Sequence, residues 1–587
     1  MSARVYEYPI TLPTHRSVLA SQLSPLFEVA KVPLYPYTFF LEPQQPPTLQ
    51  TYKFWALENA HIRALVAPDF GGRVYSLRDK HLKTPAGHAG PGAELLYDNR
   101  SVKPYTIEPR MSWISAGIEF NFPVAHSHTS MERVGSRAYE LGDRAYVEVG
   151  ETERRLGLTW VVRLSLGPDD RFLTQETFLH NPSVRPGKWH LWSNAGVEGW
   201  ADTEFMYPPA NVVVHGSRDE KNVWPGNWSK IGDREGMLGL FWLDQQALYF
   251  GAFQHRYGHG LMHLADPAVV PGMKLWTFGK EGTEEWAHLL SDDNRGYAEV
   301  QSGAFKTQEE FGNMKPGESA YFIEFWRGAA SVKDYHDAPL PHPHLSAPPP
   351  RWFGMEHIPE AQVWLHLLAA HRENAPSRIP LYDPAGTDWP PTGLELEAAL
   401  RWAAEHRKSY RTALGTWLAA RGDYKSACAA LDETADPFGK RVRGLMAWRY
   451  ERDLKSARKY FEQAAFTEPG FQLDYDALLA HLGCHADRAA VLAKFERKDY
   501  RVLEREADLL VATGKPQDAL KILSGNKWPR QHERFIRSDI WRRARAAVGE
   551  AADPVPEDLG EDKLTAGAPT PHGTLDGILR KIPELPT

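Results

Sequence analysis

The hydrophobic period of the sequence changes once, at a proline-rich stretch. Residues 338–350 read APLPHPHLSAPPP, a composition typical of a semi-rigid linker. Before this stretch, short runs of β-branched and aromatic residues alternate with clusters of Gly, Pro, Asn and Asp, and after it apolar residues recur at helical spacing. We therefore expect a β-rich domain and an α-helical domain, joined by a linker over residues 336–352.

The β-rich part is predicted to be a large antiparallel sandwich over residues 51–335. Residues 60–80 contain two alternating strands separated by the turn sequence DFGG. Similar short runs follow up to Trp326 without a long amphipathic helix between them, which argues against an α/β sheet. Residues 1–50 are proline-rich and weakly periodic, and we expect them to form an N-terminal arm.

Residues 353–550 are predicted to form degenerate tetratricopeptide repeats. The small, large, small and proline positions of such a repeat are occupied by Ala457, Phe461, Ala464 and Pro469. An array of this kind buries its core only by stacking, and it leaves a surface for a protein partner, for self-association or for a neighbouring domain. The tail, residues 551–587, is rich in Pro, Gly, Asp and Glu and is expected to be mobile.

Charge and cysteine content exclude several classes of function. Lys and Arg number 68 against 75 Asp and Glu, and the mild net charge of -7 gives no electrostatic basis for binding nucleic acid. No apolar run approaches the length of a membrane span or of a signal-peptide core, so we expect a cytoplasmic protein without a membrane partner. With Cys428 and Cys484 as the only cysteines, a disulfide framework and a cysteine zinc site are both excluded.

The densest collection of functional groups lies between Trp113 and His128, in the stretch WISAGIEFNFPVAHSH. It contains a carboxylate (Glu119), an amide (Asn121), two imidazoles and several aromatic rings. Polar groups this close to aromatic surface lose hydration unless they are hydrogen-bonded. A sugar site needs this combination, because ring faces stack on the sugar while amides, carboxylates and imidazoles bind its hydroxyls. The alternative is a buried strand corner whose polar groups satisfy one another.

Five motifs, in the same order, resemble one protein family. They are WISAGIEFNFP with the following His126, WSNAGVEG, FGAFQHRYGHGLMHLAD, LWTFGKEGTEEW and GYAEVQSGAF. On these motifs the chain resembles the bacterial and fungal family known as domain of unknown function 5107, in which such a domain commonly precedes tetratricopeptide repeats. The resemblance implies no settled activity, but it implies a fold, the galactose-mutarotase-like β-supersandwich.

Two features are also similar to aldose 1-epimerases. Residues 57–80 are similar to the first hairpin of those enzymes, and residues 297–301 are similar to the Glu-x-Gln strand that carries their catalytic base. The period of a strand places Tyr297, Glu299 and Gln301 on one face. Glu299 is therefore our candidate base, and a solvated strand face is the alternative.

We expect a carbohydrate-active enzyme that acts at an anomeric centre of a sugar or oligosaccharide, and we favour glycoside hydrolysis over epimerisation. Hydrolysis needs two carboxyl groups, for which Glu119 and Glu299 are the candidate acid/base pair. The Asn-His pair of the epimerases appears here as Ser193-Asn194-Ala195, without the histidine. Unless His126 or His128 replaces it, Glu119 is expected to donate the proton, provided that burial raises its pKa.

The other site residues are expected to bind the sugar, and they are Trp113, Asn121, His126, Asn194, Glu198, His255, His263 and Gln301. Histidines 255, 259 and 263 have a regular four-residue spacing, but glycines and a strand pattern surround them, so we expect no metal site there. No cofactor is expected. Two other functions stay open: an aldose 1-epimerase-like isomerase, and a non-catalytic carbohydrate-binding scaffold whose repeats recruit a protein partner.

Overall fold

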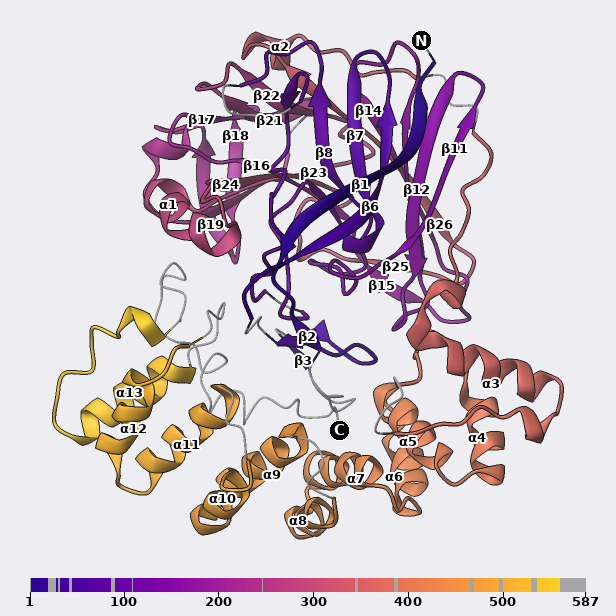
Figure 1. Cartoon of the computed structure of the whole chain (residues 1–587), viewed down its shortest axis with the longest axis vertical. Helices are drawn as coiled ribbons and strands as arrows, with labels where there is room; N and C mark the ends of the chain where they lie inside the picture. Colours follow the sequence, from indigo (N-terminus) through magenta and orange to yellow (C-terminus); the bar gives the residue numbers. More distant parts are fainter. Residues whose placement is uncertain are drawn as a thin grey trace. The chain divides into compact units, whose positions relative to one another are not determined.

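The computed structural model (Figure 1) describes residues 2–19, 28–29, 32–41, 45–85, 90–107, 109–244, 246–343, 347–384, 389–464, 469–495, 500–528 and 536–559. The chain divides into two compact units. Unit 1 contains Met1–Ser17, Pro43–Tyr105 and Ser112–Ile358, and unit 2 contains Val18–Glu42, Thr106–Met111 and Pro359–Thr587.

Unit 1 is built on a twelve-stranded sheet whose described pairings are all antiparallel. In spatial order, its strands are β1 (Arg4–Thr14), β6 (Thr48–Glu58), β7 (Ile62–Ala67), β8 (Arg73–Asp79), β10 (Ile118–Asn121), β16 (Trp192–Glu198), β24 (Tyr297–Gly303), β23 (Gly272–Thr277), β20 (Leu238–Trp242), β18 (Ala210–Val214) and β19 (Ser217–Trp224), with β9 (Ala93–Glu94) paired to β8.

A second, eight-stranded antiparallel sheet packs against the first. Its strands, in spatial order, are β11 (Gly135–Leu141), β12 (Arg144–Thr152), β13 (Thr159–Leu166), β14 (Leu173–His180), β26 (Ser319–Ala329), β22 (His259–Leu264), β21 (Tyr249–Gln254) and β17 (Thr203–Met206). Unit 1 also contains the small pair β15 (Gly187–Trp189) and β25 (Gly312–Met314), and the helices α1 (Gly279–Leu290) and α2 (Lys333–His336).

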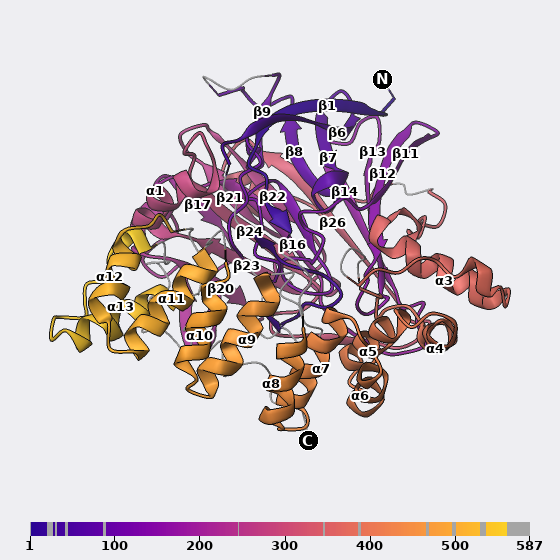
Figure 2. The same cartoon turned by 60° about the horizontal axis from the view of Figure 1, so that its bottom comes forward.

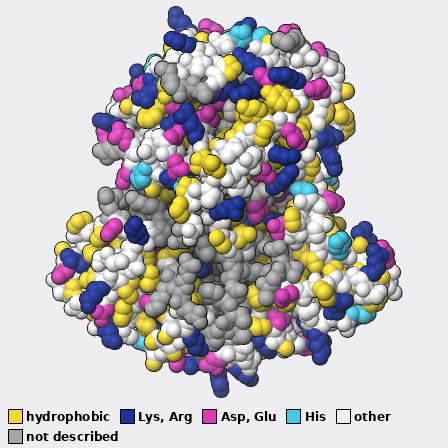
Figure 3. All heavy atoms as spheres, in the orientation of Figure 1, with side chains coloured by type: hydrophobic (Ala, Val, Ile, Leu, Met, Phe, Trp, Pro, Cys, Tyr) yellow, Lys and Arg dark blue, Asp and Glu magenta, His cyan; other side chains and the backbone are white. Residues whose placement is uncertain are grey.

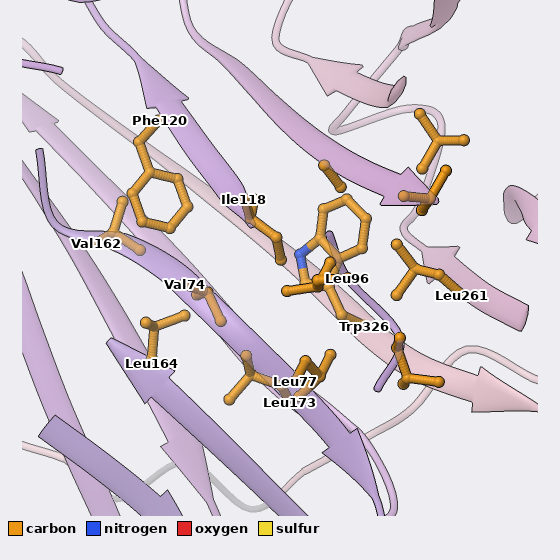
Figure 4. Packing of buried hydrophobic residues seen from close by; sticks show 14 of the residues in the cluster. Val74, Leu77, Leu96, Ile118, Phe120, Val162, Leu164, Leu173, Leu261 and Trp326 are labelled. Atoms are coloured by element: carbon orange, nitrogen blue, oxygen red, sulfur yellow. The ribbon is translucent and has the colours of Figure 1, made fainter. Parts of the chain in front are cut away.

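The core of unit 1 lies between the two large sheets. Figure 4 shows Ile118 and Phe120 of β10 among Val162 and Leu164 of β13 and Trp326 of β26, all of which are buried. Because strand residues alternate between faces, Glu119 and Asn121 of the same strand β10 point away from this core. The predicted antiparallel β-sandwich is confirmed, and its alternation places a second set of residues on the outer face of the larger sheet.

The two ends of unit 1 differ from the predicted arm and linker. Strand β1 pairs with β6 along its whole length and forms the edge of the large sheet, although its two prolines weaken the sequence pattern. Prolines are tolerated there because an edge strand leaves half of its N–H groups without a partner in the sheet. The proline-rich segment after residue 338 packs onto the eight-stranded sheet: Arg163 donates to the carbonyl of Pro348 at 2.6 Å, and the Arg351 N–H donates to Glu148 at 3.1 Å.

Unit 2 is helical, as predicted, and each of its long helices packs against the next one (Figure 2). They are α3 (Gln362–Arg372), α4 (Glu397–His406), α5 (Tyr410–Ala420), α6 (Tyr424–Asp432), α7 (Pro437–Arg449), α8 (Leu454–Gln463), α9 (Pro469–His481), α10 (His485–Leu492), α11 (Tyr500–Ala512), α12 (Pro516–Ser524) and α13 (Ile536–Ala547). The short pairs β2 (Val18–Leu19) with β5 (Phe40–Leu41) and β3 (Glu28–Val29) with β4 (Val32–Pro33) belong to this unit.

The repeat positions of unit 2 are packing positions. Ala457 and Phe461 of α8 are buried, and α9 begins at Pro469. In the preceding hairpin, a Cβ on Gly415 of α5 would lie 2.4 Å from the Leu431 side chain of α6, so the small residue lets the two helices approach closely. The tail predicted to be mobile lies outside the described residues from position 560 onward.

Asp436 is the N-cap of α7 and joins it to the preceding turn. Its carboxylate accepts hydrogen bonds from the Gly439 N–H at 2.8 Å and from the hydroxyls of Thr412 and Thr434. We expect Asp436→Ala to lower the free energy of unfolding of the helical unit by about 1–2 kcal/mol, because the cap is lost and two hydroxyls lose their acceptor. Asp436→Asn keeps an acceptor and should lose less. Urea unfolding followed by circular dichroism compares the two variants, and equal losses would contradict the capping role.

The described surface carries charges of both signs. Lys, Arg, Asp and Glu side chains are interspersed over the face shown in Figure 3. Among the described residues, no helix combines the length and the apolar composition that a membrane crossing requires.

Candidate functional site

A row of polar residues crosses the outer face of the large sheet. Glu119 of β10 lies opposite Asn194 of β16, Asn194 lies opposite Gln301 of β24, and Gln301 lies opposite Lys274 of β23. All four residues are at most 4% exposed. The row is therefore a buried polar layer that four neighbouring strands build together.

Glycines in the same strands leave room for aromatic rings beside this row. A Cβ on Gly196 would lie 2.5 Å from the ring of Tyr297, and a Cβ on Gly303 would lie 2.4 Å from the ring of Trp192. The rings of Tyr297 and Trp192 can therefore lie directly against the neighbouring backbone. The result is a surface that combines ring faces with polar groups.

Glu119 holds His126 at one end of the row. The Nδ1 atom of His126 lies 3.0 Å from Glu119 Oε2, and the indole N–H of Trp113 donates to the same oxygen at 3.2 Å. The buried guanidinium of Arg73 lies 3.8 Å from the other carboxylate oxygen. Because the Nδ1 atom of His126 contacts Glu119, its Nε2 atom is the one that could contact a ligand or transfer a proton.

The interaction between Glu119 and His126 sets the pKa of each group. Burial by itself raises the pKa of the Glu119 carboxyl, but the charge and the hydrogen bond of His126, with the charge of Arg73, bring it below its ordinary value. Burial by itself lowers the pKa of His126, but the charge and the hydrogen bond of Glu119, and then the charge of Glu299, bring it above 6.5. The pair therefore favours a carboxylate and an imidazolium.

The lowered pKa corrects one expectation about Glu119. The sequence suggested that burial makes Glu119 a proton donor, but its partner His126 keeps it ionised. The positive neighbours outweigh burial here, and His126 is the group that carries a proton.

Glu299 is held by a directed chain of hydrogen bonds. The Tyr297 hydroxyl donates to Glu299 Oε1 at 2.7 Å, and the Gln301 amide donates to Oε2 at 2.5 Å. The Gln301 carbonyl oxygen in turn accepts from the Gln308 amide at 2.9 Å, and Gln308 accepts from Lys274 Nζ at 2.7 Å. Glu299 thus has a fixed orientation on the same face as the Glu119–His126 pair.

Three buried oxygen atoms of this face have no hydrogen-bond donor among the described residues. They are Glu119 Oε1, Asn121 Oδ1 and Asn194 Oδ1. Buried polar atoms are rarely left unsatisfied, so three acceptors on one face fit a ligand, or water, that supplies hydroxyl donors. The face reaches the surface through His126, whose side chain is 24% exposed, and through the half-buried Trp276.

The structure brings together seven of the ten predicted site residues on this face: Trp113, Glu119, Asn121, His126, Asn194, Glu299 and Gln301. Glu198 lies at the end of the same strand face, where it pairs with Arg295 at 2.8 Å and accepts from Trp200 and Tyr257. The Glu198 carboxylate is therefore already bound within a network of ion pairs and hydrogen bonds.

The two remaining predicted residues lie in or next to the other sheet: His263 is part of β22, and His255 directly follows β21. His255 lies at the surface and pairs with Glu204 at 2.6 Å. His263 is buried in the core, where it contacts Glu324 at 3.0 Å and stacks on Phe250. Glu151 and Glu153, which could have supplied carboxylates, also lie on or next to strand β12 of that sheet.

Sequence reasoning missed Lys274, Gln308 and His215. A lysine within the apolar strand GMKLWT, in the same phase as Trp276, is the signal that could have identified Lys274. Gln308 and His215 lie in connections between strands and give no such signal. In the part of the chain that the structure describes, no group of three or more His, Cys, Asp or Glu residues could hold a metal ion.

Solved structures similar to the chain include one that matches it over nearly its whole length and others that match about half of it. A solved TPR-domain containing protein from Parabacteroides distasonis ATCC 8503 is 29% identical to the chain, with a TM-score of 0.87, and the match covers 96% of this chain and 98% of that one. Galactose mutarotase-like proteins from Clostridium acetobutylicum and Lactobacillus casei ATCC 334 are 13% and 10% identical, each with a TM-score of 0.34. Each match covers 47% of this chain, and 95% and 100% of theirs.

Two family profiles match the sequence. The profile described as "-like, C-terminal domain" matches residues 364–544 in the helical part. The profile described as "Domain of unknown function (DUF5107)" matches residues 29–326, which is half of the chain. The resemblance drawn from the five motifs is thereby confirmed, and the chain belongs to the DUF5107 family.

Proposed function

We propose that unit 1 binds an aldose and interconverts its anomers, with Glu299 as the general base and His126 as the general acid. The observation that carries the proposal is the pairing of His126 with Glu119, on the face that also holds Glu299. A carboxylate and a protonated imidazole are the two groups that ring opening needs. Glu119 is the positioning residue, because it orients the imidazole and keeps its proton.

Glu299 and His126 together supply and take up every proton that ring opening and reclosure transfer. Glu299 takes the proton of the anomeric hydroxyl, the C1–O5 bond breaks as the C1 carbonyl forms, and His126 donates a proton to the ring oxygen. After rotation of the aldehyde, the ring oxygen attacks the other face of C1, the imidazole recovers its proton, and Glu299 returns its own. The unsatisfied oxygens of Glu119, Asn121 and Asn194 supply acceptors for the sugar hydroxyls.

Glycoside hydrolysis is the second candidate. It is supported by the presence of two glutamates on one sugar-compatible face: Glu119 lies on β10 and Glu299 on β24, the two strands that flank β16. Hydrolysis with this pair needs one carboxyl group to be protonated. The lowered pKa of Glu119 therefore makes anomer exchange the better-supported reaction.

The helical repeats suggest a second binding surface. Stacked helical repeats of this kind commonly present a surface to a protein, and we propose that unit 2 binds a protein partner or a second copy of this chain. This role is independent of the sugar chemistry. A non-catalytic scaffold would combine sugar binding by unit 1 with partner binding by unit 2.

Nuclear magnetic resonance of freshly dissolved sugars tests the proposal. The purified chain should accelerate the exchange between α and β anomers of at least one aldose and leave disaccharides uncleaved. Cleavage of an oligosaccharide would establish hydrolysis instead. Binding that raises the melting temperature of the chain without either reaction would establish a scaffold.

A further inference from the structure

The ammonium group of Lys274 is buried, and its ion pairing among the described residues is incomplete. The residue is 4% exposed, and its Nζ atom makes one hydrogen bond, to Gln308 Oε1 at 2.7 Å. Among the described residues, no Asp or Glu forms an ion pair with it. A buried ammonium normally has a counter-charge, and Lys274 still has unused N–H donors.

The surroundings of Lys274 compensate its charge only in part. Its Nζ lies 5.2 Å from the ring centres of both Phe241 and Trp276, and these ring faces attract the ammonium without supplying a full negative charge. The ring of His215 stacks on Phe241, and it is exposed at the surface. The charged and titratable groups that act on Lys274 and His215 are Glu299, Glu309 and His126.

Glu299 does not neutralise Lys274 directly. Lys274 lies two residues along β23 from Trp276, which is the residue opposite Glu299, so the two side chains start about 7–8 Å apart. The oxygens of Glu299 accept instead from Tyr297 and Gln301. A sugar whose anomeric carbon lies at Glu299 would therefore have its far side near Lys274.

We propose that Lys274 anchors an anionic substituent of the aldose, so that the site selects sugars that carry a carboxylate or a phosphoryl group. The inference rests on the proposed sugar chemistry and names its substrate class. An anionic group would supply the missing counter-charge and accept charge-assisted hydrogen bonds from Nζ. Burial lowers the pKa of Lys274 to about 8, although Glu299 and Glu309 act in the opposite direction, and this shift indicates a charge that the fold leaves incompletely compensated.

A purely positioning role for Lys274 predicts a different result. Lys274 ends the hydrogen-bond chain that runs through Gln308 and Gln301 to Glu299. If that were its only role, its removal would lower kcat for all sugars alike. An anchor instead changes KM and binding, and only for the acidic sugars.

Calorimetry and anomer exchange on the full chain separate these roles. Glucuronate, galacturonate, glucose 6-phosphate and galactose 6-phosphate are compared with glucose and galactose, and the two acidic sets distinguish carboxylate from phosphoryl recognition. We expect Lys274→Met to weaken binding of the acidic sugars by about 10- to 100-fold and to leave neutral sugars nearly unchanged. Lys274→Arg should retain part of the preference. Lys53→Met, at an exposed position of β6 paired with Glu7, is the matched control.

The outcomes distinguish the anchor from the proposed reaction. If the wild-type chain prefers neutral sugars, or if Lys274→Met weakens both classes equally, the anchor is overturned, whether or not anomers exchange. If acidic sugars bind through Lys274 but no anomer exchange occurs, the proposed reaction fails and the anchor stands. The preference of the wild-type chain decides the question even if Lys274→Met does not fold.

Discussion

The Glu299→Gln variant is expected to bind aldoses and to exchange their anomers about 10²- to 10⁴-fold more slowly than the wild-type chain. Glutamine has nearly the same size as glutamate, but its amide oxygen cannot take the proton of the anomeric hydroxyl. The hydroxyl of Tyr297 and the amide of Gln301 hold the side chain in place. The loss should therefore appear in kcat, measured by anomer exchange, while calorimetry shows sugar affinity largely retained.

Glu204→Gln is a matched control for this substitution. Glu204 lies on β17 of the other sheet and pairs with His255 at the surface. The Glu204→Gln variant should exchange anomers at the wild-type rate. A Glu299→Gln variant with an unchanged rate would exclude Glu299 as the base, and equal losses in both variants would indicate a general effect of the substitutions on the fold.

The residues of the site that lie close together in sequence could be predicted from it. Trp113, Glu119 and His126 belong to one strand and its flanking loops, so their meeting required only local structure. Glu299 and Gln301 followed from the two-residue period of a strand, together with the similarity to the epimerase strand. For these residues, composition and period already specify which side chains share a face.

The residues that prediction misplaced or missed depend on which strands pair. His263 has the same strand phase as Leu261, which is buried between the sheets, and this phase places His263 in the core. Lys274 reaches the site only because β23 lies beside β24 in the sheet. Such non-local pairing is set by the packing of the whole sandwich, and one sequence gives no direct measure of it.

There is a physical reason to propose anomer exchange in place of the hydrolysis expected from the sequence. Counting carboxylates favoured hydrolysis, because the sequence shows Glu119 and Glu299 but not the hydrogen bond that His126 donates to Glu119. That bond turns one of the two carboxyl groups into a support for an imidazolium. Protonation states depend on neighbours, and neighbours from a flanking loop are fixed only by the fold.

The second large effect is expected from Glu119→Gln, in the pH dependence of kcat/KM. His126 must be protonated to act as the acid, so activity falls as the pH rises through its pKa. Burial lowers that pKa, and the charge of Glu119 outweighs burial and raises it above 6.5. Without this charge, burial and the nearby Lys274 dominate, and the falling limb of the profile should move to lower pH. At neutral pH the variant should therefore lose activity that acidification partly restores.

The same pair links stability to pH with a definite sign. Because the pKa of His126 is raised on folding, its contribution to stability is complete below 6.5 and is lost as the pH rises through the folded value. Because the pKa of Glu119 is lowered, its contribution is complete above 4.5 and is lost as the pH falls through the folded value. Between these values the wild-type chain should exceed Glu119→Gln in melting temperature by its largest margin.

His255→Asn, which removes an exposed histidine next to the other sheet, is the control for the activity profile and should leave that profile unchanged. A Glu119→Gln profile that coincides with the wild-type profile would mean that another group donates the proton.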